Sequence, residues 1–373
     1  MEEWKECKLG DIAHFTTGKL NSNAAEDNGI YPFFTCSPET FKINSYAFDT
    51  SAILLAGNNA EGNFNIKRYS GKFNAYQRTY VITVDDNTDL IFLFYALKLC
   101  LAEFKHISQG TATKFLTAQI LNNFVIRIPP LPTQQKIAAI LSSLDDKIEL
   151  NNKINTNLEQ QAQALFKEMF ESKIQNVSEN DGRSLGEIVN VIDNRGKTPP
   201  LEATKTDFPI IDVGTLNSPG RIINYKDCTK FVSKTTYETF FRAGHPKEKD
   251  VLLLTVGCNL ALLKYYIGSV GCIAQNIVAF RAKEISSLYI YEYLKFIQPD
   301  LVSYDIGSAQ PSIKVTHIIK HLIYIPTNDE LSKFNSFAKC ITEQIYNNVC
   351  ENERLISIRD TLLPKLMDGE IEV

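Results

Sequence analysis

The residue types that most often carry catalysis are scattered along this sequence. Eight cysteines lie in apolar segments without a Cys-x-x-Cys pair, and five histidines form no cluster. His317 and His321 are four residues apart but lack a third ligand nearby. Structural zinc needs about four closely placed ligands, so we predict reduced core thiols, with no metal site and no disulfide framework.

The stretch "NRGKTPP" (194–200) contains Gly-Lys-Thr, as phosphate loops do. A phosphate loop would also need glycine at Val191 and a helix after Thr198, where Pro199 and Pro200 stand instead. We also find no glycine fingerprint for S-adenosylmethionine, no Asn-Pro-Pro-Tyr motif and no convincing Ser-His-Asp or Cys-His arrangement. We therefore predict that the chain is not an enzyme and holds no cofactor.

A different chemistry is available to the amides and cations. Asn and Gln can form paired hydrogen bonds with adenine, Arg with guanine, and Lys and Arg with phosphate. The sequence predicts DNA contacts from Asn58, Asn59, Lys67, Arg68, Lys72, Gln77, Arg78, Gln109, Thr113 and Lys114 in its first half. In the second half the candidates are Asn194, Arg195, Lys197, Asn259, Lys264, Gln275, Asn276, Gln310 and Lys314. Taken singly, each of these side chains is slightly better explained by loop and turn chemistry, and that alternative stays open.

The charge distribution favours local basic faces over a strongly basic protein. The net charge of the chain is −4, yet residues 62–84 and 251–283 contain no acid. Residues 1–130 carry −1 and 183–326 carry +4, whereas 131–182 and 327–373 carry −3 and −4. This pattern suits DNA binding that depends on base contacts and partner subunits more than on bulk charge.

An internal repeat organises the elements that must position these side chains. "KLGDI" (8–12) returns as "SLGEI" (184–188), and "QGTATKFLTAQILNNFVIRIP" (109–129) returns as "IGSAQPSIKVTHIIKHLIYIP" (306–326). Between them, "SAILLAG" (51–57) resembles "VLLLTVG" (251–257), each a buried strand that opens into a loop. We align Gly57 with Gly257 and expect two related domains.

Each repeat is followed by a long helical segment. From Thr133, a candidate N-cap, apolar residues recur at spacings of four and three, which predicts a helix over 133–172. Asn151 and Asn155 interrupt this seam, and Asn348 and Asn352 interrupt the second seam at the same places. We predict that these asparagines are buried in an antiparallel two-helix coiled coil and fix its register, although a solvent-exposed pair is the alternative for one helix alone.

The expected architecture is α/β (α+β). Two recognition domains, 1–130 and 183–326, are separated by two long helices, in 131–182 and 327–373, that form an antiparallel coiled coil. No apolar run approaches the ~18 residues of a membrane span, and no signal peptide is recognisable, so we expect a cytoplasmic protein.

Four stretches carry a family resemblance over nearly the whole chain: "LGDI", "RGKTPP", "PPLPTQQKIAAILSSLDDKIELNNKI" and "LISIRDTLLPKLMDGEIEV". The sequence resembles the specificity subunit of type I restriction-modification systems. Two features depart from that family: "IPTNDELSKF" (325–334) is a poor copy of the proline-glutamine lead-in, and Arg359 interrupts the second seam.

The resemblance implies that each domain, similar to the target-recognition domain of adenine methyltransferases, reads one half of a split DNA site. The helices would set the spacing of the halves and dock two methylation subunits, which carry S-adenosylmethionine. Restriction subunits, which use ATP and Mg²⁺, would join that core. Two rivals remain: a stand-alone DNA-binding regulator, and a coiled-coil scaffold without a DNA role.

Overall fold

The computed structural model describes residues 4–178, 182–196, 198–268, 270–307 and 310–373. The chain forms two compact units, Met1–Lys147 with Leu355–Val373, and Ile148–Arg354. The expected domain limits follow the secondary-structure elements, whereas the compact units divide both long helices. Among the described residues, no helix is long and apolar enough to cross a membrane.

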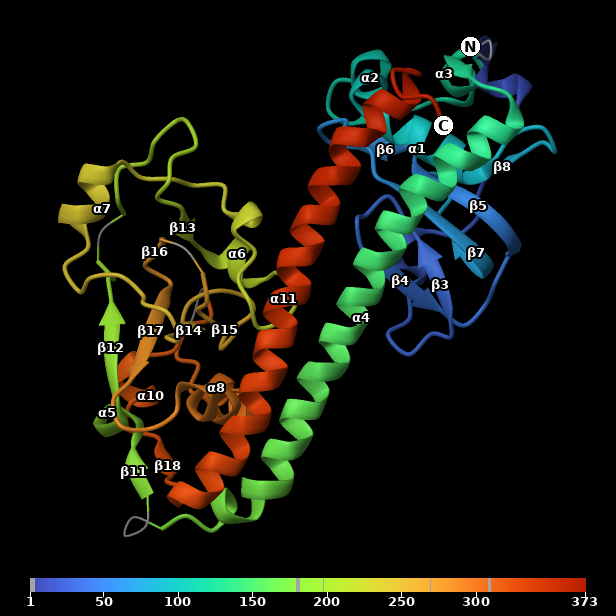
Figure 1. Cartoon of the computed structure of the whole chain (residues 1–373). Helices are drawn as coiled ribbons and strands as arrows, with labels where there is room; N and C mark the ends of the chain where they lie inside the picture. The colour runs from blue at the N-terminus through green and yellow to red at the C-terminus, as the bar shows by residue number, and fades with distance from the viewer. Residues whose placement is uncertain (1–3, 179–181, 197, 269, 308–309) are drawn as a thin grey trace. The chain divides into compact units, whose positions relative to one another are not determined.

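The first unit is built around one mixed sheet (Figure 1). Its strand order is β2-β8-β5-β7-β3-β4, with β3 and β7 parallel and the other neighbours antiparallel. The strands are β2 (Ala13–Thr17), β3 (Tyr31–Phe34), β4 (Thr40–Ile43), β5 (Phe48–Ala56), β7 (Ile66–Ala75) and β8 (Thr79–Val84). Smaller antiparallel pairs join β1 (Lys5–Lys8) to β10 (Val125–Ile128) and β6 (Asn58–Asn59) to β9 (Lys114–Phe115).

Short helices complete the first unit. They are η1 (Leu9–Asp11), η2 (Ser22–Ala24), α1 (Leu90–Leu99), α2 (Leu101–Ile107) and α3 (Ala118–Asn123). The side chain of Asp89 caps α1 by accepting a hydrogen bond from the backbone N–H of Phe92. Helix α1 is apolar nearly all round because it packs between the sheet and the ends of the long helices, where Ile137, Leu141 and Leu363 share its core.

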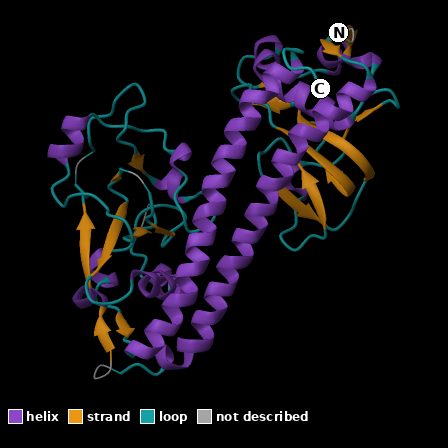
Figure 2. Cartoon of the chain, in the orientation of Figure 1, coloured by secondary structure: helices purple, strands orange, loops and turns teal. Residues whose placement is uncertain are grey.

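The second unit repeats this plan with a smaller sheet, of order β12-β17-β14-β15 and antiparallel throughout. Figure 2 shows the strands of both units in orange. The strands are β12 (Val189–Asp193), β14 (Val251–Leu254), β15 (Leu263–Tyr265) and β17 (Ile277–Ala282). A parallel pair joins β13 (Ile210–Ile211) to β16 (Cys272–Ile273), and an antiparallel pair joins β11 (Gly182–Ser184) to β18 (Leu322–Tyr324). The helices are α5 (Leu185–Ile188), α6 (Val213–Leu216), η3 (Tyr225–Asp227), α7 (Lys234–Phe240), α8 (Ser287–Phe296), α9 (Gln298–Ser303) and α10 (Val315–Ile318).

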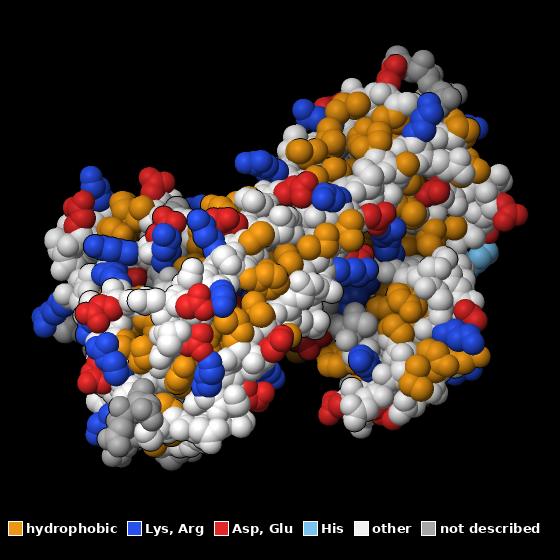
Figure 3. Space-filling view, turned by 60° about the horizontal axis from the view of Figure 1, so that its bottom comes forward, with side chains coloured by type: hydrophobic (Ala, Val, Ile, Leu, Met, Phe, Trp, Pro, Cys, Tyr) orange, Lys and Arg blue, Asp and Glu red, His pale blue; other side chains and the backbone are white. Residues whose placement is uncertain are grey.

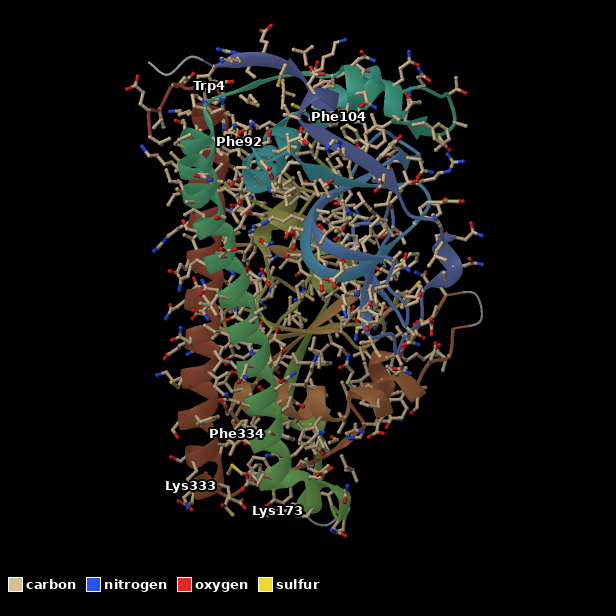
Figure 4. All side chains as sticks on the ribbon, turned by 90° about the vertical axis from the view of Figure 1, so that its right-hand side faces the viewer. Trp4, Phe92, Phe104, Lys173, Lys333 and Phe334 are labelled. Carbon is tan, nitrogen blue, oxygen red and sulfur yellow. The ribbon has the colours of Figure 1, made fainter. Side chains whose placement is uncertain are left out.

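The repeat expected from the sequence is therefore present in the central elements of both units. The β1–β10 pair corresponds to β11–β18, the β2-β8-β5 strands correspond to β12-β17-β14, and α1 corresponds to α8. In the second unit α8 packs on the long helices through aromatic rings. The ring centre of Tyr289 lies 5.6 Å from that of Phe166 and 5.2 Å from that of Phe170. Phe334, labelled in Figure 4, joins this cluster from the other long helix, 5.7 Å from Phe166.

The two long helices are α4 (Leu131–Gln175) and α11 (Asn328–Met367), of 45 and 40 residues. They run antiparallel, since in the second unit Asn151 bonds Asn352 whereas Asn155 bonds Asn348. Helix α4 begins two residues before the expected start. The carbonyl of Pro130 accepts from the N–H groups of Thr133 and Gln134, at 3.0 and 3.1 Å, so Thr133 is not the N-cap. Pro132 fits the first turn because no partner for its missing N–H is needed there.

Helix α11 starts by different means, which explains its poor match to the proline-glutamine lead-in. Thr327 Oγ1 accepts from the backbone N–H of Glu330 at 3.4 Å, and Glu330 Oε2 accepts from the N–H of Thr327 at 2.8 Å. This is a capping box, which satisfies two N–H groups that a helix start leaves unpaired. Glu330 also pairs with Lys173 near the end of α4 (Figure 4).

Candidate nucleic-acid interface

Three loops of the first unit meet at Gly57, the residue after β5. The N–H of Gly57 donates to the carbonyl of Arg78 at 2.8 Å, and the carbonyl of Gly57 accepts from the N–H of Leu116 at 2.9 Å. One bond fastens the turn between β7 and β8, and the other fastens the hairpin over 109–115. We call the residues 57–59, 76–79 and 109–115 the first loop cluster.

The second unit has the same hydrogen-bond pattern around Thr255. The N–H of Thr255 donates to the carbonyl of Asn276 at 2.8 Å, and its carbonyl accepts from the N–H of Ile313 at 2.8 Å. The hairpins also correspond, because the N–H of Gln109 donates to Phe115 and the N–H of Ile306 donates to Ser312, each at 3.0 Å. We call the described residues of 255–259, 274–277 and 306–314 the second loop cluster.

This pattern corrects the alignment of the two apolar strands. The sequence comparison paired Gly57 with Gly257, but the hydrogen bonds pair Gly57 with Thr255. Strand β5 ends at Ala56 and β14 ends at Leu254, immediately before these two residues. A glycine therefore ends both motifs by coincidence, and Asn58 and Asn59 have no asparagine counterparts directly after Thr255.

Each loop cluster contains a tight turn whose two central residues are polar. The N–H of Thr79 donates to the carbonyl of Tyr76 at 2.8 Å, which leaves Gln77 and Arg78 as the central residues, both exposed. In the second unit the N–H of Ile277 donates to the carbonyl of Ala274 at 3.0 Å, with Gln275 and Asn276 at the centre. Glutamine thus stands first in both turns, followed by arginine in one and asparagine in the other.

The first loop cluster surrounds a hollow of about 530 Å³. Its lining includes Gln77, Arg78, Gln109 and Phe115. The guanidinium carbon of Arg78 lies 5.3 Å from the centre of the Phe115 ring, a cation–π distance. Three predicted base-reading side chains therefore converge on one concave surface.

The other predicted residues of this unit's loops lie beside the hollow. Asn58 and Asn59 form β6 and pair with Phe115 and Lys114 of β9, while Thr113 is half-buried in the adjoining hairpin. The side-chain oxygen of Asn59 accepts from the N–H groups of Glu61 and Asn63, at 2.9 and 3.0 Å. Asn59 thus shapes its own loop, as the turn alternative allows.

Three cations predicted on β7 make internal contacts. Lys67 donates to the carbonyls of Ser37 and Glu39, and burial lowers the pKa of its ammonium. Arg68 forms an ion pair with Asp146 of α4 at 3.0 Å. The ammonium of Lys72 is exposed and lies 4.7 Å from the centre of the Tyr46 ring. Of the three, Lys72 alone presents an exposed cation.

In the second unit, exposed side chains again gather on the loop cluster. Asn259, Gln275, Gln310 and Lys314 are exposed, whereas Asn276 is half-buried. The amide of Asn259 donates to the side chain of Asn217 at 3.2 Å. Lys197, also predicted to contact DNA, lies outside the described residues.

Three predicted residues of this unit are at odds with a DNA contact, and the first is Lys264. It is 1% exposed on β15 and donates to the carbonyls of Ser218 and Gly220, at 2.5 and 2.6 Å. Burial lowers the pKa of its ammonium to about 8. Strand residues alternate between faces, and the sequence could not tell that Lys264 faces inward to hold a loop.

The other two belong to the "RGKTPP" segment, which also uses its polar groups internally. Asn194 donates from Nδ2 to the carbonyl of Gly244 at 2.8 Å and accepts from the N–H of Ala243 at 3.0 Å. The guanidinium of Arg195 pairs with the carboxylate of Asp193 at 2.5 Å. These contacts give Asn194 and Arg195 structural roles beside a hollow of about 300 Å³.

The sequence analysis missed three residues that belong to the loop clusters or contact them. Asn21 Oδ1 accepts from the amide of Gln77 at 3.0 Å, which orients that amide. Phe115 supports Arg78, and Ile306 occupies the place of Gln109 in the second loop cluster with 49% exposure. The repeat already aligned Ile306 with Gln109, so that position could have been found, whereas the contact of Asn21 could not.

The four seam asparagines are buried where α4 faces α11 in the second unit. Their exposures are 1% for Asn151, 9% for Asn155, 5% for Asn348 and 8% for Asn352. Asn151 donates to Asn352 at 2.9 Å, and Asn348 donates to Asn155 at 2.7 Å. An offset of one heptad would break both bonds inside an apolar seam, which is the physical basis of register selection.

A buried ionic cluster fastens the second unit's domain to the helices. The side chain of Arg221 is fully buried and pairs with Glu159 of α4 at 2.7 Å and with Glu292 of α8 at 2.8 Å. It also donates to Thr342 of α11 at 3.0 Å. Burial opposes the charge of Arg221, but the two carboxylates outweigh it and raise the pKa of the guanidinium.

The first unit uses a corresponding cluster, which accounts for the cation that interrupts the second seam. Arg359 pairs with Asp145 of α4 at 2.6 Å, and the hydroxyl of Tyr95 on α1 donates to the same carboxylate at 2.6 Å. Burial opposes ionisation of Asp145, yet the bonds from Tyr95 and Arg359 lower the pKa of its carboxyl. Arg359 thus makes a specific contact and is not a defect of the seam.

On the face shown in Figure 3, Lys and Arg side chains are interspersed with Asp and Glu. Recognition of a polyanion would therefore depend on the loops and their amides as well as on cations.

Comparison with known proteins shows to which family the repeated unit belongs. Residues 1–160 and 178–347 each match the family described as type I restriction modification DNA specificity domain. The chain belongs to this family. The chain is 41% identical over 148 residues to the Escherichia coli type I restriction enzyme EcoDI specificity subunit, a match that covers 39% of this chain and 32% of that relative. It is 26% identical to the HindI specificity subunit of Haemophilus influenzae, over the whole of both chains.

The fold of this specificity-domain protein also resembles a solved structure. The type I restriction-modification system S subunit from M. genitalium aligns with a TM-score of 0.62 and 19% identity, covering 98% of this chain and 96% of that one. At this identity the likeness concerns the fold alone. It supports two domains of mixed helix and sheet together with two long antiparallel helices.

Proposed function

We propose that this chain is the DNA sequence-specificity subunit of a type I restriction-modification complex. Each loop cluster reads one half of a split, asymmetric DNA site. The observation that carries this proposal is the repeated hydrogen-bond pattern around Gly57 and Thr255, which presents two similar turns with different side chains. Two similar backbone turns that carry different side chains suit the recognition of two different half-sites.

The partners proposed are double-stranded DNA, two methylation subunits and restriction subunits. S-adenosylmethionine would be carried by the methylation subunits, and ATP with Mg²⁺ by the restriction subunits, while this chain performs no catalysis. The long helices would dock the methylation subunits and set the gap between half-sites. Docking has an available surface, because Leu150 and Ile154 of α4 are 51% and 38% exposed.

Exchange of one domain tests the proposal. Residues 183–326 would be replaced by the corresponding domain of a homologue, and each chain would be expressed with its cognate methylation subunit. Long-read profiling of plasmid DNA should show an adenine-methylated split motif for the unaltered chain, and a motif with one new half for the chimera. A chimera that alters both halves, or neither, while remaining folded would contradict the proposal.

Removing the methylation subunit or this chain distinguishes the proposal from its two rivals. A stand-alone regulator would bind its DNA equally well without a methylation subunit. A coiled-coil scaffold would copurify with partners but would leave the methylated motif unchanged when removed. If the purified chain binds DNA only together with the methylation subunit, the specificity-subunit proposal is favoured over both rivals.

A further inference from the structure

The paired turns carry information about which bases each domain reads. In both turns the carbonyl of the second central residue is held by two donors. The carbonyl of Arg78 accepts from the N–H of Gly57 at 2.8 Å and from the thiol of Cys36 at 3.3 Å. That of Asn276 accepts from the N–H and the hydroxyl of Thr255, at 2.8 and 3.0 Å. The backbones of the turns are therefore fixed, and their side chains project from a rigid support.

The first central residue is the same in both domains. Gln77 and Gln275 are exposed, and a glutamine amide matches the N6 donor and N7 acceptor of adenine. The bond from Gln77 to Asn21 uses one amide hydrogen and leaves the other hydrogen and the oxygen available. Asn21 is thus a positioning residue for Gln77.

The second central residue differs, and its surroundings differ with it. Arg78 lies against the ring of Phe115, with its guanidinium carbon 5.3 Å from the ring centre. In the other domain the shorter Asn276 follows the glutamine, and Ser312 takes the hairpin position that Phe115 has in the first unit. An extended guanidinium is therefore supported in one domain only, and guanidinium is the group that recognises guanine O6 and N7 in a paired manner.

The hairpins differ in the same sense. Gln109 is an exposed amide in the first loop cluster, whereas Ile306 places an exposed apolar side chain at the equivalent position of the second. In the major groove the methyl group of thymine is the apolar feature of an A·T pair. Ile306, Gln275 and Asn276 consequently all suit A·T pairs.

We infer that the first loop cluster reads a half-site containing a G·C pair, through Arg78, and that the second reads A·T pairs, through Gln275, Asn276 and Ile306. This inference rests on the proposed function. It assigns a base class to each domain, which the family match alone does not.

Reciprocal substitution tests the assignment. Arg78→Asn should relax the preference for guanine at one position of the half-site read by the first domain, by about tenfold or more, and leave the other positions unchanged. Asn276→Arg combined with Ser312→Phe, which supplies the ring that the second hairpin lacks, should introduce a guanine preference at one position of the other half-site. Both are measured by methylation profiling and by binding of the assembled complex to duplexes altered at one base pair at a time.

The control is Lys72→Asn, which removes the same charge from an exposed strand position of the first unit. If Lys72 contributes to binding only through its charge, its removal should weaken binding evenly over all sequences. If folded Arg78→Asn behaves like this control, or changes nothing, the assignment is wrong while the proposed function stands. If Arg78→Asn does not fold, the folded double variant Asn276→Arg with Ser312→Phe decides alone, and no gain of guanine preference there overturns the assignment. Absence of any methylated motif with the unaltered chain would instead refute the proposed function.

Discussion

The amide of Asn151 donates to the side-chain oxygen of Asn352 at 2.9 Å, across the seam of α4 and α11. Both residues are almost fully buried, and the oxygen of Asn151 has no hydrogen-bond partner among the described residues. Polar groups in an apolar seam cost stability but favour one register. The pair therefore lowers the stability of the coiled coil but favours one alignment of the two helices.

Replacing both members should raise stability. We expect Asn151→Leu with Asn352→Leu to increase the free energy of unfolding by about 1–3 kcal/mol. The double variant removes the unsatisfied oxygen of Asn151, and it also removes both side chains of the Asn151–Asn352 hydrogen bond, so neither is left buried alone. Asn352→Leu alone should lower it by about 1–3 kcal/mol, because it leaves the amide of Asn151 without this acceptor. Chemical denaturation measures both, with Asn157→Leu at an exposed position of α4 as the control. Equal losses of stability for the single and double variants would rule out this account.

The same double variant tests the register. If the helices set the gap of a split DNA site, as proposed, a slipped register should add a second gap length to the methylated motif. One heptad corresponds to ~10 Å along a helix, or about three base pairs. A stabilised variant that keeps a single, unchanged gap would show that other contacts fix the register.

Much of this architecture was predictable because the sequence repeats it. The seam asparagines recur at matching heptad positions, and only burial gives that recurrence a physical reason. The site was less predictable. Gly57 and Gly257 end similar motifs, but the hydrogen bonds select Thr255, and no local pattern shows which backbone groups will pair. Lys264 was predicted from its charge, whereas its position depends on the loop carbonyls that it holds, which is tertiary information.

Removing the arginine of the buried ionic cluster should be costly. Arg221→Met leaves Glu292, whose side chain is fully buried, without its cation, and we expect the free energy of unfolding to fall by about 3–5 kcal/mol. Burial already raises the pKa of Glu292. Glu292→Gln added to Arg221→Met should therefore recover part of that stability, and exposed Arg242→Met should change little. Absence of any recovery would indicate that Arg221 acts through packing alone.

In the first unit, removing Arg359 should lower stability more than removing the hydroxyl of Tyr95. Arg359→Ala removes the ion pair to Asp145 and should lower the free energy of unfolding by about 1–3 kcal/mol at neutral pH. Tyr95→Phe removes one hydrogen bond to the same carboxylate and should cost about 1 kcal/mol. Because both groups contact Asp145, their effects should not be additive, and a double-variant cycle measures the coupling. Strict additivity would show that the two groups do not share this carboxylate.

The capping box of α11 predicts an acid dependence. The bond from Lys173, together with the bonds from Thr327, outweighs the opposing effect of burial and lowers the pKa of Glu330 to about 2. A carboxyl whose pKa is lower in the folded state than in the unfolded chain contributes stability above the unfolded value, near 4.3, and that stability disappears as the pH falls toward 2. The melting temperature of Glu330→Gln should therefore lie below that of the unaltered chain at pH 7, and the difference should shrink as the pH falls from about 4.3 to 2. Glu168→Gln, at an exposed position of α4, serves as the control for removal of one negative charge. A difference that persists undiminished at pH 2 would mean that the carboxylate charge of Glu330 is not what stabilises the start of α11.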